Sequence, residues 1–245
     1  MKHSLLLSWL LLAIPSIGIS QTDSVRNYSQ ASYFFQPSAL PLPKGTLLYN
    51  NYYLLVNSVQ YSLTGNLIAA GGFSLSPVSA PSLFARIQYS VPVTDKIHIG
   101  LTASYYRLSY DSPRRSHLFI PQILLTSGTP MSHGTFGMGL VRGNYWFTDF
   151  DGNWLFNLPD QIRMTTSLSY SRQVWRQFHL VTQNHYFKGN NRIGQSEVVV
   201  FSLGAKYVLG KSAFKAGILK FYYPKGTAVR FSVAYPVASY SLTIR

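Results

Sequence analysis

The chain has 245 residues, enough for one β-barrel or β-sandwich without a second domain. Only 11% of its residues are charged, whereas 47% are hydrophobic and 15% are aromatic. A soluble domain usually has about 25% charged residues because its surface faces water. The composition therefore favours a protein whose exterior lies in hydrocarbon, with aromatic side chains at the membrane interfaces. An aromatic-rich secreted β-sandwich also uses many Tyr residues, and it remains the alternative from composition alone.

The balance of charge is strongly basic: 21 Lys and Arg residues face 7 acidic residues, for a net charge of +14. Such a balance is common in nucleic-acid-binding proteins. Here the basic residues are scattered, however, and the one adjacent pair is Arg114-Arg115 within a polar stretch. We therefore expect no nucleic-acid partner. The absence of cysteine excludes a disulfide framework, thiolate chemistry and a lipoprotein acylation site.

Residues 1–20 have the pattern of a secretory signal peptide. Lys2 precedes an apolar run over 5–14, and the small residues Gly18 and Ser20 stand where a signal peptidase reads. We expect cleavage before Gln21 and export. No later stretch offers about 20 consecutive apolar residues, so we expect no membrane-spanning helix.

Residues 21–45 are first polar and then rich in proline, with Pro37, Pro41 and Pro43. Proline cannot donate a hydrogen bond to a strand ladder. The segment is therefore predicted to be an N-terminal extension or strap that either enters the barrel or hangs free. The barrel domain would occupy residues 46–245.

From Thr46 onward the sequence alternates between apolar and polar residues, the pattern of strands with one apolar face. In 83–92, for example, Leu83, Ile87 and Tyr89 share one face and Arg86 lies on the other. The strand candidates are 46–63, 67–75, 83–92, 97–109, 117–127, 134–147, 161–173, 177–188, 196–209, 213–222 and 227–235, with short pieces at 153–157 and 239–244. We predict an all-β protein: an antiparallel, up-and-down transmembrane β-barrel of 10–12 strands in a bacterial outer membrane.

Two details of this pattern stay open. The alternation in 134–147 changes phase near Val141, as either a β-bulge or a loop between two strands would cause. Connections at 64–66, 94–96, 151–153 and 189–191 are predicted to be short turns, and those at 76–82, 110–117, 128–133 and 189–195 to be longer loops.

Residues 36–73 carry a family resemblance. Gln36-Pro37-Ser38-Ala39-Leu40-Pro41-Leu42-Pro43-Lys44-Gly45 leads into an aromatic strand with Asn51, then Tyr61-Ser62-Leu63-Thr64-Gly65-Asn66 and Gly71-Gly72-Phe73. This stretch resembles the N-terminal part of uncharacterised outer-membrane β-barrel proteins of Bacteroidetes-type bacteria. The family has Glu, Gly and Asp where this chain has Thr46, Ser62 and Gly65. The resemblance implies a barrel of unknown role and no catalytic residues.

Basic residues lie on the polar face of several predicted strands. An Arg facing lipid at the bilayer midplane costs about 2–4 kcal/mol, so these side chains are expected to point into the lumen. The candidates for lining the lumen are Arg86, His98, Arg163, His179, Lys206 and Arg230. Two interpretations remain: a narrow porin-like channel that favours small anionic solutes, or a closed lumen of structural or binding character.

The histidines do not predict a metal site. His179 and His185 share one strand face but are six residues apart, about 20 Å by strand rise. With no cysteine and few carboxylates, we expect no metal and no other cofactor. An outer-membrane hydrolase acting on lipid, built on a Ser–His pair, is the alternative function. No local motif supports it, and we expect no enzymatic activity.

Arg114 and Arg115 lie in a loop bounded by Ser and Pro. Such a pair either contacts lipid phosphates of the outer leaflet or is solvated. The partners expected from the sequence are thus outer-membrane lipid and small anionic solutes, and the sequence does not determine the oligomeric state.

Overall fold

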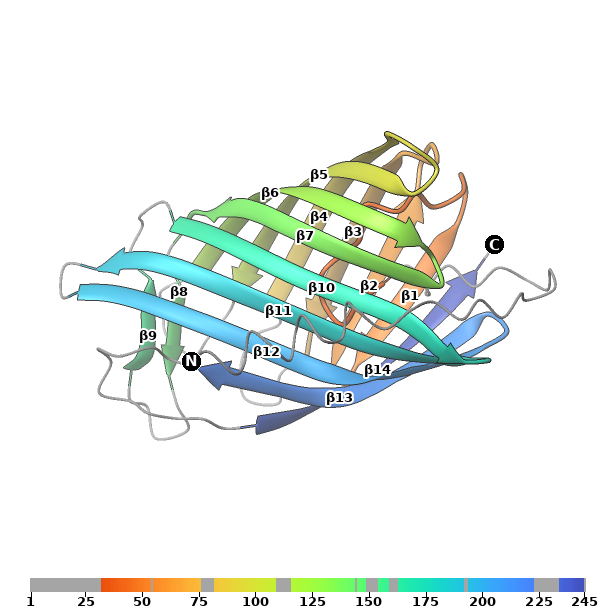
Figure 1. The fold of residues 1–245 in the computed structure, drawn as a ribbon. Coiled ribbons are helices and arrows are strands. Elements are labelled where there is room, and N and C mark those ends of the chain that lie inside the picture. The colour runs from red at the N-terminus through yellow and green to blue at the C-terminus, as the bar shows by residue number, and fades with distance from the viewer. Residues whose placement is uncertain are drawn as a thin grey trace.

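In the computed structural model, the described residues are 32–53, 55–75, 82–108, 116–143, 145–148, 154–158, 163–191, 194–222 and 234–244. Twelve strands form one closed barrel with antiparallel neighbours throughout, and two more form a separate hairpin (Figure 1). Within these residues no helix is long and apolar enough to cross a membrane. The barrel strands are β1 (Leu47–Tyr52), β2 (Val56–Ser62), β3 (Leu67–Ser74), β4 (Ser82–Pro92), β5 (Ile97–Leu108), β6 (Ser116–Thr129), β7 (Ser132–Val141), β10 (Arg163–Trp175), β11 (Phe178–Asn191), β12 (Gly194–Leu209), β13 (Ser212–Tyr222) and β14 (Ala234–Ile244).

Strands that follow one another in the chain pair with one another around the barrel. The cylinder closes where β1 pairs with β14, from Leu47 opposite Ile244 to Tyr52 opposite Ser239. The hairpin of β8 (Tyr145–Thr148) and β9 (Trp154–Leu158) stands in the connection between β7 and β10 and leaves the order unchanged. The predicted up-and-down barrel is confirmed, at the upper end of the predicted strand number. A closed cylinder excludes the two stacked sheets of a sandwich.

The predicted strand 46–63 is wrong as one element, because the chain reverses direction in its middle. β1 and β2 are antiparallel neighbours, with Tyr52 opposite Val56. Tyr53 adopts a φ of 52°, and the Leu55 amide donates to the Tyr52 carbonyl at 3.0 Å. No Gly or Pro marks this turn, and the polar face keeps the same parity on both sides of it. The sequence pattern therefore continues through the reversal.

The phase change near Val141 comes from an interruption and not from a bulge. The β7–β10 ladder runs without a register shift from Ser132 to Val141, where β7 ends. Tyr145 begins β8, and of the described strands only β9 pairs with it. The predicted strand 134–147 is thus two elements, and the piece at 153–157 belongs to the separate hairpin instead of the barrel. The predicted separation of 227–235 from 239–244 is also wrong, since β14 is continuous from Ala234 to Ile244. Residues 227–233 lie outside the described residues.

The two ends of the barrel differ. At one end, here called the turn end, five short connections join consecutive strands: 63–66, 93–96, 130–131, 176–177 and 210–211. β1 begins and β14 finishes at this end. The opposite end, the loop end, carries two short connections, 53–55 and 192–193, and four longer ones, 75–81, 109–115, 142–162 and 223–233. The expected loops at 128–133 and 189–195 are wrong, because β6, β7, β11 and β12 extend into them.

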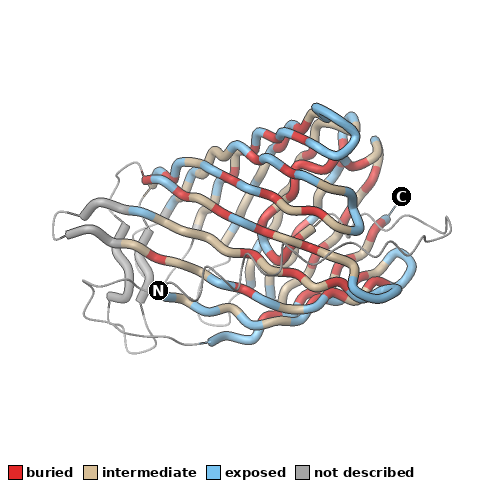
Figure 2. Tube along the Cα trace, in the orientation of Figure 1, coloured by how far each residue is buried: buried red, intermediate tan, exposed pale blue. Residues whose placement is uncertain are grey.

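Most of the exposed large side chains between the two ends of the barrel are apolar. Exposed and buried residues alternate along the strands (Figure 2), so each strand presents one face outward and one inward. The exposed aliphatic residues between the two ends include Ile87, Leu101, Ile123, Met138, Leu203 and Ile218. Most aromatic residues on the exterior lie nearer the ends, whereas Phe136 and Phe201 lie midway along β7 and β12. Those toward the turn end are Tyr61, Tyr89, Trp175, Phe178 and Phe214, and those toward the loop end are Phe73, Tyr105, Phe119 and Tyr222.

Candidate functional site

The described residues before β1 lie inside the barrel. Ser32–Gly45, here called the plug, contributes the buried side chains Tyr33, Phe34, Ala39, Leu40 and Leu42. None of these five is more than 5% exposed. Phe34 and Tyr33 form a small core with Val181 and Val237 of the barrel wall. The sequence leaves two placements open for this segment: inside the barrel, or free of it. The described part of the segment lies inside the barrel.

The first half of the plug is fixed by side chains of the wall. The Tyr33 hydroxyl donates to Thr135 Oγ1 at 2.8 Å, and burial raises the pKa of this phenol, which keeps it protonated as a donor. The Phe35 amide donates to Gln183 Oε1 at 2.8 Å. Gln36 spans two serines of β10: its Nε2 donates to Ser167 Oγ at 2.6 Å and its Oε1 accepts from Ser169 Oγ at 3.0 Å.

The second half is fixed on other strands and leads back to the turn end. The Ala39 amide donates to Thr126 Oγ1 of β6 at 2.8 Å. Gln88 Nε2 of β4 donates to the Ser38 carbonyl at 2.8 Å, and Ser62 Oγ of β2 donates to the Leu42 carbonyl at 2.8 Å. The plug is thereby held by hydrogen bonds from strands on all sides of the lumen. Each satisfies a buried polar group that would otherwise be costly.

Glycines in the wall leave the space that the plug occupies. A Cβ at Gly204 or Gly217 would lie 2.7 or 2.9 Å from Cζ of Phe34. A Cβ at Gly137 would lie 2.6 Å from Nε2 of Gln36, and one at Gly100 would lie 3.0 Å from the Ala39 Cβ. These glycines make the inner wall complementary to the plug.

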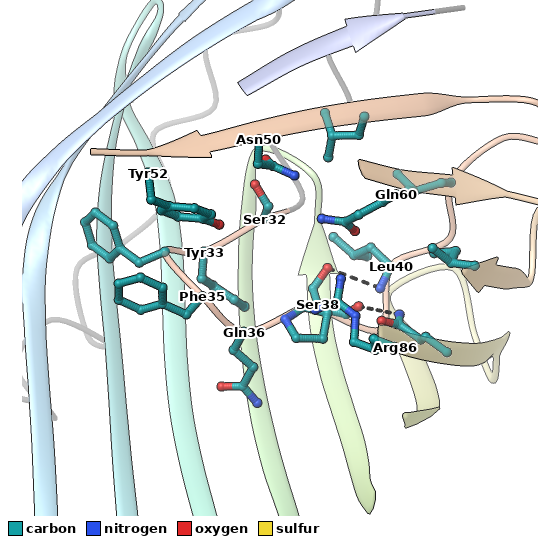
Figure 3. A pocket seen from close by; sticks show the side chains of 16 residues that line it. Ser32, Tyr33, Phe35, Gln36, Ser38, Leu40, Asn50, Tyr52, Gln60 and Arg86 are labelled. Carbon is teal, nitrogen blue, oxygen red and sulfur yellow. Dashed lines mark hydrogen bonds between the residues drawn. The ribbon is translucent and has the colours of Figure 1, made fainter. Parts of the chain in front are cut away.

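The space left between the plug and strands β1 to β4 is small. It is a cavity of about 30 Å³, room for only a water molecule or two. Figure 3 shows Ser32 to Leu40 crossing the lumen beside Asn50, Tyr52 and Arg86 of the wall. Arg86, one of the residues predicted to line the lumen, thus borders the plug.

The other predicted lumen residues lie at different heights. His98, His179 and Lys206 are buried toward the turn end of β5, β11 and β12, and Arg163 is buried at the loop end of β10. The structure brings His179 and Lys206 directly opposite one another. Three of the predicted residues lie outside the described part of the chain: Arg114, Arg115 and Arg230.

Lys206 has a second neighbour that the sequence reasoning missed. Lys215 of β13 is its direct cross-strand partner, and neither lysine is more than 2% exposed. Both ammonium groups bind the plug: Lys206 Nζ donates to the Ser32 carbonyl at 3.2 Å, and Lys215 Nζ donates to Ser32 Oγ and the Tyr33 carbonyl, each at 2.8 Å. Alternation in 213–222 could have revealed Lys215, since it opposes Phe214, Ala216 and Ile218.

The described part of the lumen contains basic residues and no acidic ones. Asp95 and Glu197 are the only described carboxylates; Asp95 is exposed in the turn between β4 and β5, and Glu197 lies on the outward parity of β12, opposite Lys188. Inside are Arg86, Arg163, Lys206 and Lys215 together with the histidines of β5, β7 and β11. With these side chains the inner wall is electropositive.

His133 is also part of this wall, although the sequence placed it in a loop. It is buried on β7, its ring centroid 5.0 Å from that of Tyr33. In the described part of the chain, Nε2 of His133 and both ring nitrogens of His179 find no hydrogen-bond partner. Among the described residues, no group of three or more His, Asp or Glu side chains comes together as metal ligands would.

Comparison with known proteins gives a likeness of architecture. No family model matches the chain, and no curated protein matches it. Similar solved structures include the NanC porin, with 9% identity, 82% of this chain and 98% of that chain covered, and a TM-score of 0.49. The CymD monoaromatic hydrocarbon channel has 12% identity, coverage of 83% and 89%, and a TM-score of 0.44. OccK5 (OpdH) of Pseudomonas aeruginosa has 14% identity, coverage of 81% and 63%, and a TM-score of 0.44. What this chain has in common with these proteins is the β-barrel.

Proposed function

We propose that this protein is an outer-membrane β-barrel that admits small anionic solutes to its lumen, and that its own N-terminal segment closes the lumen at one end. The observation that carries the proposal is the inner wall, where buried Lys and Arg side chains have no described carboxylate among them. Cations would be repelled from such a wall and anions attracted to it.

The exterior supports the membrane location. Large apolar side chains such as Leu203 and Ile218 are more than half exposed, at 52% and 58%. In water this surface would promote aggregation, whereas in a bilayer it matches the acyl chains, with aromatic residues toward both interfaces. Short turns of outer-membrane barrels face the periplasm. The turn end and the plug would therefore face the periplasm, consistent with the export signal expected at residues 1–20.

The way the plug is held supports a closure that can open. Its contacts are mostly hydrogen bonds to Ser, Thr, Gln and Lys side chains, and its apolar core with the wall is small. When the plug leaves, water can take over those hydrogen bonds, so the net cost per bond is only about 0.5–1.5 kcal/mol. A lumen filled by an apolar core would not have this property.

Planar-bilayer recording of the full-length protein tests the proposal. Under a KCl gradient, the reversal potential should show that Cl⁻ is favoured over K⁺, and transitions between closed and conducting levels should occur. A cation preference would refute the electropositive lumen, and the lack of any current under all voltages would refute passage of solutes.

A further inference from the structure

Two arginines and a histidine meet on the outside of the barrel near the loop end, where β5, β6 and β7 lie side by side (Figure 1). Arg107 of β5 stands directly opposite His117 of β6. Arg142, just after β7, exchanges backbone hydrogen bonds of 2.7 and 2.9 Å with Phe119, which is two residues from His117 on the same face. Side chains directly opposite have Cβ atoms about 4.5–5.5 Å apart, and diagonal neighbours about 7–8 Å. Both guanidinium groups can therefore reach a ligand at His117, and we call these three residues the basic cluster.

The imidazole of His117 is oriented by Tyr105. The Tyr105 hydroxyl lies 2.6 Å from His117 Nδ1, and the two rings stack with their centroids 5.9 Å apart. We assign the phenol as the donor, which places the proton of the neutral imidazole on Nε2. Since His117 is exposed, this N–H faces outward as a third donor beside the two guanidinium groups.

The charge of the basic cluster suits an anion. The two described carboxylates lie elsewhere: Asp95 is in the β4–β5 turn at the opposite end, and Glu197 is on β12 opposite Lys188. A guanidinium group binds phosphate oxygens with two parallel hydrogen bonds, which a single ammonium group does not. Two such groups with a neutral N–H between them are well matched to one phosphate.

An apolar groove of about 620 Å³ adjoins the basic cluster on the same outer surface. Its floor is low because the small side chains of Ala103 and Pro121 stand directly opposite one another on β5 and β6. Larger side chains rise around this floor: Leu101, Ile123, Met138 and Leu140. Ligand pockets generally have volumes of about 300–1,000 Å³. Along β5, Arg107 is only four residues beyond Ala103, about 13 Å by strand rise.

The two features lie at depths that correspond to two parts of a lipid. The groove faces outward among aliphatic side chains, at the level of acyl chains. Tyr105 and Phe119 are the next outward residues toward the loop end, where aromatic residues mark the interface. The basic cluster begins at this level, so its charges lie among head groups, where an Arg costs much less than at the midplane.

We propose that the basic cluster binds the phosphate monoester of a lipid head group in the leaflet at the loop end, and that an acyl chain of the same lipid lies in the groove over Ala103 and Pro121. The charge selects the head group, and the groove selects a lipid over a soluble phosphate. This inference goes beyond the proposed function and does not rest on it, because it requires a barrel in a bilayer and no open lumen.

Native mass spectrometry of the full-length protein in detergent micelles tests the site by measuring the binding of single lipids. Phosphatidic acid is the probe, and phosphatidylcholine with the same acyl chains is the reference. At about pH 8 a phosphate monoester carries nearly two charges. Taking about fivefold for each Arg beside an anionic lipid, the wild type should bind one phosphatidic acid about 30-fold more tightly than phosphatidylcholine. Glycerol phosphate, which lacks acyl chains, should not displace it.

Variants separate the two parts of the site. Arg107→Gln/Arg142→Gln should reduce the preference for phosphatidic acid to less than about threefold. Lys188→Gln/Lys220→Gln is the matched control, since it removes two charges from exposed outward positions of β11 and β13, and it should keep the preference. Ala103→Phe fills the groove from outside the barrel and should weaken the binding of both lipids by a similar factor. Heat-modifiable gel mobility verifies that each variant is a folded barrel.

Equal affinities of the wild type for the two lipids, or a preference that survives Arg107→Gln/Arg142→Gln, would overturn the site. A preference lost equally in the lysine control would overturn it in favour of net charge, and displacement by glycerol phosphate in favour of free phosphate. Unchanged lipid binding in Ala103→Phe would refute the groove. Failure of the proposed function is distinct: a lipid preference without current in bilayers retains this site and refutes the channel, and an anion-selective current with equal lipid affinities does the reverse.

Discussion

Replacing Phe34 with Ala tests whether the plug is a docked element with a defined stability. Phe34 is fully buried, with its ring against the paired glycines 204 and 217 and within the small core that includes Val181. Burial of a Phe side chain contributes about 1.5–3 kcal/mol, and the cavity left behind adds to the loss. Taking about 3 kcal/mol, with 1.4 kcal/mol per tenfold, the undocked fraction should rise about 100-fold. A single Ala39→Cys thiol is buried while the plug is docked, so its rate of labelling by a maleimide in detergent micelles reports the undocked fraction. Comparing this rate with and without Phe34→Ala measures the ratio directly.

The neighbouring Phe35 provides the control. Its side chain is 48% exposed and stacks on Tyr52, with ring centroids 5.4 Å apart. Phe35→Ala removes the same number of atoms from the same segment, yet should raise the labelling rate by less than about tenfold because less area is buried. Equal rates for the two variants, or a Phe34→Ala rate equal to that of the parent, would refute the docking described here.

Three further predictions concern the wall. Leu203→Arg places a charge on the lipid-facing surface of β12 and should lower the free energy of folding into lipid vesicles by about 2–4 kcal/mol, measured by urea titration; an effect below about 0.5 kcal/mol would place this face outside the hydrocarbon. Gly128 has a φ of +120°, and a Cβ at this position would lie 2.2 Å from a backbone oxygen. Gly128→Ala should therefore lower the stability of the barrel by at least about 1–3 kcal/mol. Gly210→Ala is the control, because the space around Gly210 is open, and it should cost less. In the conducting state, Lys206→Gln/Lys215→Gln should move the reversal potential toward zero; an unchanged potential would assign the selectivity to other residues.

The sequence predicts the barrel well because each strand must satisfy two environments at once. Alternation such as that of Leu83, Ile87 and Tyr89 against Arg86 follows directly from an apolar exterior and a polar interior. What alternation cannot reveal is a reversal that keeps its parity, as at Tyr53, where no turn residue marks the change of direction. It also cannot reveal whether a strand pairs within the barrel or in a separate hairpin, as for Tyr145 onward.

The candidate site depends on contacts between distant parts of the chain. Arg163, Lys206 and His179 could be assigned to the polar parity from local sequence, but the pairing of Lys206 with Lys215 requires the register of β12 and β13. The plug was harder still. Its hydrogen bonds join residues 32–42 to partners 20 to 183 positions away, and nothing in a proline-rich stretch specifies them.

Closure of an electropositive lumen by the plug can be tested most directly with a disulfide between the plug and the wall. A Cβ at Gly100 would lie 3.0 Å from the Ala39 Cβ, so after a small adjustment Ala39→Cys/Gly100→Cys can form a disulfide, and the chain has no other cysteine. Single-channel current of this double variant is recorded before and after adding a reductant. The oxidised protein should stay closed, and reduction should restore anion-selective openings. Equal currents in the two states would contradict closure by the plug.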